Sequence, residues 1–391
     1  NETIRTPNLD KLASRGVKFT DYHSNGVVCS PTRAALLTGN YQQRTGIEGV
    51  VTAKNHRHVG FQADLSLAAY FKEQHYKTGI IGKWHLGYDT LFSPLNNGFD
   101  YFKGFVSGNI DYHSHIDQEG YFDWWEDKDT LSESGYSTDL ITSNSIDFIA
   151  KNKEQNFFLY VAHEAPHYPY QGRNDPADRT IQGQFNNLGS RTDRAQAYKE
   201  MIEVMDEGIG TLVDYLDKHD LLEHTLILFV SDNGASKLGS NGPYKGFKGN
   251  VWEGGHRVPA IAYWENTISP GVIDQTLLSM DIFPTLVELV GASDQKDLRF
   301  DGRSFLPLLK DSTAILESRT LFWRFGDTKK AVRAAQWKYI YFEGQEYLYD
   351  LDKDPGEAQN LKHSFPSIRD SLRNSLAEWE KEMSDYKRIT F

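Results

Sequence analysis

The sequence contains one thiol, and the residues around it are of types that favour reactivity. Cys29 stands in VVCSPTRAALLTG (27–39) and is the only cysteine among 391 residues. A helix predicted over TRAALLTG places the thiol near a helix N-terminus, where N–H groups and partial positive charge favour an anion. Arg33, one helical turn further on, adds a cationic fork that suits a tetrahedral anion. The alternative is a small, buried and inert cysteine.

Other polar clusters carry groups that could serve the same chemistry. They are GKWHLG with Lys83 and His85, HEAPH with His167, SDNG with Asp232 and Asn233, and FKGNVWEGG with Lys248. The first three stand at or after apolar runs that resemble strands. Ligands bind at the carboxyl ends of strands in doubly wound sheets, so chemistry is expected there. Each cluster alone has an ordinary alternative: a solvated lysine, a structural histidine, or a turn.

The elements that must position these clusters follow from periodicity. TPNLDKLASRG predicts a short helix, with Thr6 as cap, Pro7 at its first position and Gly16 at its end. VKFTDY alternates like a strand, and apolar runs at 77–82, 156–163 and 225–231 predict strands buried on both faces. A helical stripe over 198–216 lies between the last two runs. This alternation of strands and helices predicts an α/β fold with helices on both faces of a sheet.

The pattern changes after about residue 310. TLFWRFG, KKAVRAAQWKYIYFEG and QEYLYDLDKDPGE predict consecutive antiparallel strands, and an amphipathic helix follows with Ile368, Leu372, Leu376 and Trp379 on one face. The predicted fold is therefore α/β, with a large mixed, mostly parallel sheet sandwiched by helices and a small C-terminal α+β domain. The predicted domains are 1–310, which carries the chemistry, and 311–391.

Bulk composition excludes several classes of protein. The formal net charge of −12 argues against a nucleic-acid binder. It does not exclude an anionic substrate. Exposed charges are screened over about 8 Å at physiological salt, so a local cationic pocket can outweigh the distant net charge. A single cysteine forms no internal disulfide, and no run approaches the roughly 18 apolar residues of a membrane span.

The motifs around Cys29 and the other polar clusters resemble those of a known family. CSPTRAALLTG resembles the signature of the type I sulfatases, Cys-x-Pro-x-Arg followed by a Leu-Thr-Gly stretch. The resemblance extends over essentially the whole chain and keeps the family's order. Its further motifs are GIIGKWHLG, GFDYFKGF, FFLYVAHEAPHYP, FVSDNGA, FKGNVWEGGHRVPAIAYW and LYDLDKDPGEAQNL.

The resemblance implies that Cys29 is the precursor of the nucleophile. In that family a formylglycine-generating enzyme reads the proline and arginine and oxidises the cysteine to formylglycine. One oxygen of the hydrated aldehyde then attacks sulfur, and the second loses its proton and expels sulfate, so that a hard substitution is split into two easier steps.

The resemblance also assigns roles to the other clusters. Lys83 and Lys248 correspond to lysines that bind sulfate. His85 corresponds to a histidine that hydrogen-bonds the formylglycine hydroxyl, and His167 corresponds to a histidine near the leaving-group oxygen. Asp232, Asn233 and Cys29 correspond to ligands of a divalent cation, usually calcium, which prefers oxygen ligands. The family's first strand ends in an Asp-Asp pair that completes the metal site. We expect that strand and pair upstream of residue 1.

The substrate is the least specified part of the interpretation. The segment 108–127 is rich in His, Tyr and Trp, and His113, His115, Trp124 and Trp125 could read a sugar; a packed loop is the alternative. The chain resembles bacterial carbohydrate sulfatases most. This implies a sulfated carbohydrate substrate, such as a glycosaminoglycan or algal polysaccharide fragment, and a periplasmic or extracellular location.

Two other functions stay open at this stage. One is a phosphonate or phosphate monoester hydrolase of the wider alkaline phosphatase superfamily. The other is a non-catalytic glycan-binding relative, which would be expected to lack Cys29, Arg33 or Lys248; all three are present.

Overall fold

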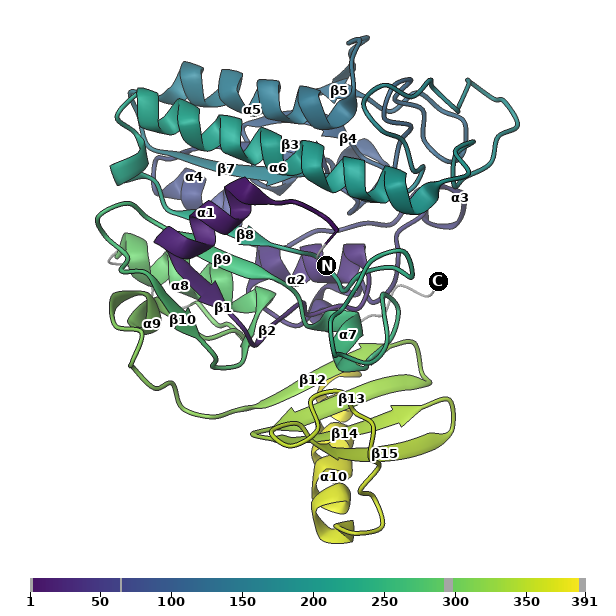
Figure 1. Ribbon diagram of the computed structural model, residues 1–391, viewed down its shortest axis with the longest axis vertical. Helices are drawn as coiled ribbons and strands as arrows, with labels where there is room; N and C mark the ends of the chain where they lie inside the picture. The colour runs from purple at the N-terminus through teal and green to yellow at the C-terminus, as the bar shows by residue number, and fades with distance from the viewer. Residues whose placement is uncertain (1–2, 64, 292–297, 387–391) are drawn as a thin grey trace. The chain divides into compact units, whose positions relative to one another are not determined.

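The computed structural model describes residues 3–63, 65–291 and 298–386, and Figure 1 shows the course of the chain. The contacts within it divide the chain into two units, each assembled from separate segments. The first unit comprises Asn1–Val17, Val51–Ile227 and Ala262–Pro270. The second comprises Lys18–Val50, Leu228–Ile261 and Gly271–Phe391.

The first unit is built on a five-stranded mixed sheet with the order β6-β5-β4-β3-β7. Its strands are β3 (Lys77–Lys83), β4 (Tyr101–Phe105), β5 (Trp125–Glu126), β6 (Asp129–Thr130) and β7 (Phe157–Ala162). β3 runs parallel to both β4 and β7, whereas β5 and β6 pair antiparallel. Gly104 lies opposite Gly82, and a Cβ on Gly104 would stand 2.1 Å from the Gly82 carbonyl oxygen.

Helices cover both faces of this sheet. Phe158 of β7 stacks on Phe71 of α4 (Leu67–Glu73), with ring centroids 4.7 Å apart. The neighbouring Phe157 meets Phe148 of α5 (Ser137–Asn152) edge to face at 6.3 Å. Successive strand residues point to opposite faces, so α4 and α5 lie on opposite sides of the sheet. α6 (Arg194–Lys218) packs along α5 and against α1 (Pro7–Arg15), as Figure 1 shows.

The second unit contains most of a sheet with the order β10-β1-β9-β8, and a parallel pair of β11 with β2. These strands are β1 (Val17–Phe19), β2 (Tyr22–His23), β8 (Ile227–Val230), β9 (Ala260–Tyr263), β10 (Gly271–Ile273) and β11 (Leu277–Leu278). The buried helix α2 (Cys29–Thr38) packs against α8 (Ile282–Val290). α2 ends at Gly39, whose φ of 68° is left-handed backbone that favours glycine.

The same unit ends in a four-stranded antiparallel sheet, β12 (Thr320–Phe325), β13 (Lys329–Ala334), β14 (Trp337–Phe342) and β15 (Gln345–Asp350). The helix α10 (Pro366–Met383) packs on β13 and β14 (Figure 1). Leu372, Leu376 and Trp379 bury its apolar face, and Trp379 stacks on Phe322 at 5.0 Å. We call these four strands and this helix the C-terminal sheet and its helix.

Short elements complete the described chain. They are η1 (Gln42–Thr45), α3 (Ala53–His56), η2 (Thr90–Phe92), η3 (Pro94–Asn97), η4 (Leu222–His224), α7 (Glu253–His256), η5 (Ser279–Asp281) and α9 (Leu306–Lys310). Over the described ranges, the helices lack the combination of length and apolar character that crossing a bilayer requires.

The predicted fold class is confirmed: the structure is mixed α/β, with helices on its sheets and an antiparallel sheet near the C-terminus. Two local predictions were wrong. Thr6 makes no side-chain cap on α1, although Pro7 starts and Gly16 ends the helix as expected. β7 and β8 are only partly buried, because each stands at the end of its sheet order. The division at residue 310 stays a prediction.

Candidate functional site

Cys29 is the first residue of α2 and is buried. The sequence predicted a helix from Thr32, but the structure begins it three residues earlier. The Thr32 hydroxyl contacts the Val28 carbonyl one turn back at 3.3 Å and accepts from the Gly26 N–H at 3.0 Å. Pro31 is tolerated in this first turn, where its missing N–H costs no helical bond. The thiol therefore lies at the helix N-terminus, as the sequence indicated.

Two polar side chains from distant parts of the sequence meet this thiol. The Lys248 Nζ lies 3.3 Å from the Cys29 Sγ, and the thiol lies 3.5 Å from the Asn233 Oδ1. A cation beside a thiol at a helix N-terminus favours negative charge on the group at position 29. The same surroundings suit an anionic substrate.

Arg33 pairs with the other residue of the SDNG cluster. Its Nε and Nη2 donate to the Oδ2 of Asp232 at 3.2 and 3.1 Å. This contact compensates a buried guanidinium and holds the aspartate beside Asn233. The structure thus brings together, within the second unit, five residues predicted for the site: Cys29, Arg33, Asp232, Asn233 and Lys248.

Backbone hydrogen bonds hold the three segments that carry these side chains. The Lys248 N–H donates to the Ala235 carbonyl at 2.9 Å, and the Gly249 N–H donates to the Val27 carbonyl at 2.8 Å. The segments also approach closely at Gly234, where a Cβ would stand 1.9 Å from the Gly254 carbonyl oxygen. Glycine at 234 is therefore required by the approach of the two loops.

Lys83, His85 and His167 lie in the first unit. Lys83 is buried at the end of β3, and the His85 Nε2 lies 3.1 Å from the Val51 carbonyl oxygen. A Cβ at Gly108 would stand 2.7 Å from that Nε2, so glycine makes room for the ring. The His167 Nδ1 lies 2.9 Å from the Tyr168 carbonyl oxygen.

The buried Glu164 lies in the same unit, within the HEAPH cluster. Burial raises the pKa of Glu164 well above its ordinary value, although the Ile110 N–H and the charge of Lys83 act in the opposite direction.

The aromatic segment 108–127 is packed rather than open around His115. That side chain is buried, stacks on Trp124 with ring centroids 4.8 Å apart, and pairs through Nε2 with the Gly135 carbonyl at 3.1 Å. His113 is less buried, and its Nε2 lies 3.1 Å from the Gly172 carbonyl oxygen. These contacts favour the packed-loop alternative for His115 and Trp124.

The donor set at Asp232 and Asn233 fits a hard cation such as calcium. A carboxylate and an amide oxygen are suitable ligands, and Asn233 is already beside position 29. Calcium takes about six to eight oxygen ligands, so these residues would supply part of a complete set.

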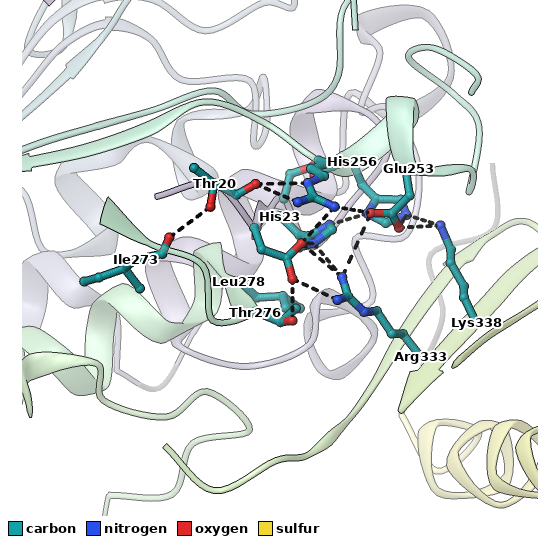
Figure 2. Close-up of polar contacts among 12 residues, drawn as sticks. Thr20, His23, Glu253, His256, Ile273, Thr276, Leu278, Arg333 and Lys338 are labelled. Atoms are coloured by element: carbon teal, nitrogen blue, oxygen red, sulfur yellow. Dashed lines mark hydrogen bonds and ion pairs between the residues drawn. The ribbon is translucent and has the colours of Figure 1, made fainter. Parts of the chain in front are cut away.

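A different group of metal-ligand type lies in the second unit. His23, Glu253 and His256 bring one ligand atom each within 4.8 Å of the others, and all three are buried. Figure 2 shows that Lys338 and Arg333 of the C-terminal sheet reach into this group. The Lys338 Nζ lies 2.7 Å from the Glu253 Oε1 and 3.1 Å from the His256 Nε2. An ammonium group therefore already supplies the positive charge that a cation would bring.

Two buried histidines stand at the centre of this network. The His256 Nε2 lies 3.1 Å from the Lys338 Nζ and 3.2 Å from the Val251 carbonyl oxygen. The His256 Nδ1 lies 2.8 Å from the His23 Nδ1, and the His23 Nε2 lies 2.9 Å from the Asp21 Oδ1 and 3.3 Å from the Arg333 Nη1. Burial lowers the pKa of both histidines, and Lys338 lowers that of His256 further, which favours neutral rings at pH 7.

Sequence reasoning missed this network, which consists of Asp21, His23, Glu253, His256, Arg333 and Lys338. One signal was present. Arg333 and Lys338 stand directly opposite each other on β13 and β14, within otherwise apolar stretches. A cation that points inward from a strand predicts a buried acidic partner from another segment, because an unpaired buried charge is costly.

Comparisons with known proteins agree with these motifs. A family model described as sulfatase matches residues 1–292. A second, described as N-sulphoglucosamine sulphohydrolase, C-terminal, matches residues 245–382.

Two relatives are named as sulfatases, and a solved structure shares the fold. An uncharacterised sulfatase of Escherichia coli, YdeN, is 32% identical over 346 residues, which cover 81% of this chain and 59% of that protein. The N-acetylgalactosamine-6-sulfatase of Canis lupus familiaris is 32% identical over 385 residues, 90% of this chain and 70% of that protein. A crystal structure of Ps i-CgsB with k-i-k-neocarrahexaose has a TM-score of 0.88 at 28% identity, covering 99% of this chain and 89% of that chain.

The neutral histidine pair predicts a pH-dependent contribution to stability. The pKa of His256 is lower in the folded chain than in the unfolded chain. Below about pH 6.5 the unfolded chain therefore binds a proton at His256 and the folded chain does not, so acidification should destabilise the wild type relative to His256→Gln. The variant should be less stable at pH 7, and the gap in the free energy of unfolding should narrow by up to about 1.4 kcal/mol per pH unit between pH 6.5 and 5. Urea unfolding measures this gap; a gap that stays constant from pH 7 to 5 would contradict the assignment.

Proposed function

The chain belongs to the sulfatase family, whose members are sulfuric ester hydrolases, and we propose that it hydrolyses sulfate esters of a carbohydrate through a formylglycine derived from Cys29. The observation that carries the proposal is the pairing of Lys248 and Asn233 with Cys29 at the N-terminus of α2. It places cationic and polar groups around the one thiol of the chain.

The residues of this cluster have separate tasks in the proposed reaction. Formylglycine hydrate would supply two geminal hydroxyls, one to displace the alcohol from sulfur and one to release sulfate. Lys248 would bind a sulfate oxygen beside position 29 and stabilise the charge that develops there. Arg33 would orient Asp232 through the two hydrogen bonds that it donates to Oδ2. The formylglycine-generating enzyme would be the partner in maturation.

The family resemblance supports roles for three residues of the first unit. We propose that Lys83 binds sulfate and that His85 bonds the formylglycine hydroxyl and assists the elimination. Either His167 or Lys248 protonates the leaving group. A histidine suits proton transfer because its unperturbed pKa lies near neutral pH.

The proposed metal is calcium, held by Asp232, Asn233 and the modified residue 29. Their oxygen atoms suit a hard cation, and the family resemblance adds two aspartates from a segment outside this numbering. When bound, the ion would polarise the sulfate group as a Lewis acid.

The substrate class rests on the relatives. One acts, by its name, on N-acetylgalactosamine 6-sulfate, and Ps i-CgsB was crystallised with k-i-k-neocarrahexaose. Both support a sulfated carbohydrate, such as a glycosaminoglycan or algal polysaccharide fragment. Such a polymer would be available to the enzyme in the periplasm or outside the cell, and we propose a periplasmic or extracellular location for this protein. His113, the less buried histidine of its segment, is the better candidate of the two for a sugar contact.

Cys29→Ala should abolish turnover and leave the fold intact, because alanine fits a buried helix position without strain. In protein produced with a formylglycine-generating enzyme, mass analysis of the Cys29 peptide should find an aldehyde in place of the thiol. Activity is measured side by side on aryl sulfate, phosphate and phosphonate esters. Full activity of Cys29→Ala would end the proposal, and a preference for the phosphorus esters would favour the related hydrolase instead.

Lys248→Ala should lower kcat by roughly 100-fold, the scale expected when one donor to a developing charge is removed. A lysine that only attracts polyanions would affect association instead, and its effect would vanish at high salt. The measurement is kcat on a small sulfate ester at low and high ionic strength. A kcat close to that of the wild type under both conditions would place Lys248 outside the sulfate site.

Chelation of divalent metal should remove activity, and added calcium should restore it, because the proposed ion polarises the sulfate. Asp232→Asn should lower the affinity for calcium and move the activity curve to higher calcium concentration, since it removes the charge of one ligand. The measurement is activity against free calcium concentration, with elemental analysis of the purified protein. Active protein without any divalent metal would contradict the roles of Asp232 and Asn233.

A further inference from the structure

We propose that the C-terminal sheet positions Lys248 for the reaction, and that Lys245 and Lys329 are the positioning residues. The inference rests on the proposed function of Lys248 and adds what holds that lysine in place. It concerns the segment 241–252, which links the SDNG cluster to α7 and which we call the lysine loop.

Lys245 anchors the lysine loop in an aromatic cage. Its Nζ lies 3.9 Å from the ring centroid of Trp252, 5.7 Å from that of Tyr349 and 5.8 Å from that of Tyr347. It also donates to the Glu357 carbonyl at 3.3 Å. An ammonium within about 6 Å of an aromatic ring face is attracted by the ring quadrupole. Both tyrosines belong to β15, so this cation ties the loop to the C-terminal sheet.

The cage is itself a packed structure. Trp252 meets Tyr347 edge to face at 5.0 Å, and Tyr347 stacks on Tyr349 at 6.3 Å. Trp252 is buried among the core residues around the C-terminal sheet. The end of the lysine loop is thus fixed by Trp252, and Lys245 brings the middle of the loop onto the same aromatic surface.

Lys329 of β13 provides the second anchor. Its Nζ donates to the Gly249 carbonyl at 3.3 Å, one residue after Lys248. The Gly249 N–H in turn donates to the Val27 carbonyl, two residues before Cys29. The peptide that follows Lys248 is therefore held between the C-terminal sheet and the segment that carries the thiol.

The lysine loop needs such anchors because its own backbone is permissive. It has no regular secondary structure before α7, and Gly242, Gly246 and Gly249 all have positive φ. Glycine has more backbone freedom than any other residue, so a loop with three of them samples many conformations unless it is held. A displacement of about 1 Å at a catalytic group can cost up to roughly 100-fold in rate.

The network of Figure 2 makes the base of the loop rigid. Glu253, the first residue of α7, pairs with Lys338 at 2.7 Å, and its N–H donates to the Glu357 Oε2 at 2.7 Å. Lys338 also lies 2.9 Å from the Glu357 Oε1. The C-terminal sheet therefore fixes the end of the loop and, through Lys245 and Lys329, its middle.

The test uses the full matured enzyme with 4-nitrocatechol sulfate as the probe. Lys245→Met keeps the side-chain length and removes the charge; it should lower kcat roughly tenfold, while the melting temperature stays close to that of the wild type. Lys245→Arg restores a cation in the cage and should return kcat to within about threefold. Lys330→Met is the matched control. Lys330 also lies over an aromatic ring of this sheet, that of Tyr341, and its ion pair is with Glu380 of α10, away from the lysine loop in sequence and in partner.

A double-mutant cycle decides whether Lys245 acts through Lys248. In the Lys248→Ala background, Lys245→Met should have no further effect on kcat, because the group that it positions is gone. An equal loss of kcat in both backgrounds would overturn the inference. So would a wild-type kcat in Lys245→Met, or a lower melting temperature with kcat per folded enzyme unchanged.

Binding of inorganic sulfate separates this inference from the proposed function. Lys245→Met should weaken sulfate binding, measured by calorimetry, and Lys330→Met should not. If the wild type binds sulfate but hydrolyses no sulfate ester, the proposed function fails. The positioning role is then tested by whether Lys245→Met binds sulfate more weakly than the wild type and Lys330→Met. If the wild type hydrolyses the ester and Lys245→Met matches it in both kcat and sulfate affinity, only the positioning role fails.

Discussion

The second unit depends on two cations that the C-terminal sheet buries among acidic side chains. Lys338 is fully buried and pairs with Glu253 and Glu357, while Arg333 pairs with Asp21 through both of its terminal nitrogens. Burial alone would raise the pKa of Asp21 and Glu253. The hydrogen bond with His23 and the charge of Arg333 at Asp21, and the charge of Lys338 at Glu253, outweigh burial and hold both pKa values below their usual range. Removing one partner of a buried pair costs about 3–5 kcal/mol, because the remaining charge stays buried without compensation. The strands and loops that carry these groups must therefore assemble together.

This constraint extends to the proposed nucleophile. Asp21 and His23 precede the segment that leads into Cys29, and Glu253 and His256 follow the loop that carries Lys248. The network thus fixes one flank of each of the two segments whose side chains meet at 3.3 Å, although 219 positions separate them in the sequence. The chemistry at position 29 also depends on this local arrangement rather than on the net charge of −12, because exposed distant charges are screened, whereas the partly buried Lys248 lies 3.3 Å from the thiol.

Most of the fold was predictable because its signals are local. The apolar stripe over 198–216 is enough to define α6, and the alternating stretches after residue 310 define four strands and α10, since the period of the pattern differs between helix and strand. Element ends were less predictable. The start of α2 at Cys29 and the missing side-chain cap at Thr6 depend on individual hydrogen bonds. Several conformations satisfy the local sequence equally well at such positions.

By itself, the sequence determined the residue types that carry the chemistry, their order, and the family to which they point. Cys29, Arg33, Asp232, Asn233 and Lys248 were all singled out by type and motif. Only the tertiary structure decided which groups meet: Arg33 pairs with Asp232, His115 packs on Trp124, and Lys245 lies against Trp252 and two tyrosines of β15. It also revealed which acidic side chains pair with the buried cations Arg333 and Lys338, since those partners come from distant segments of the sequence. The reason is physical: periodicity depends on neighbours a few residues away, whereas the burial and pairing of a charge depend on segments that packing alone brings together.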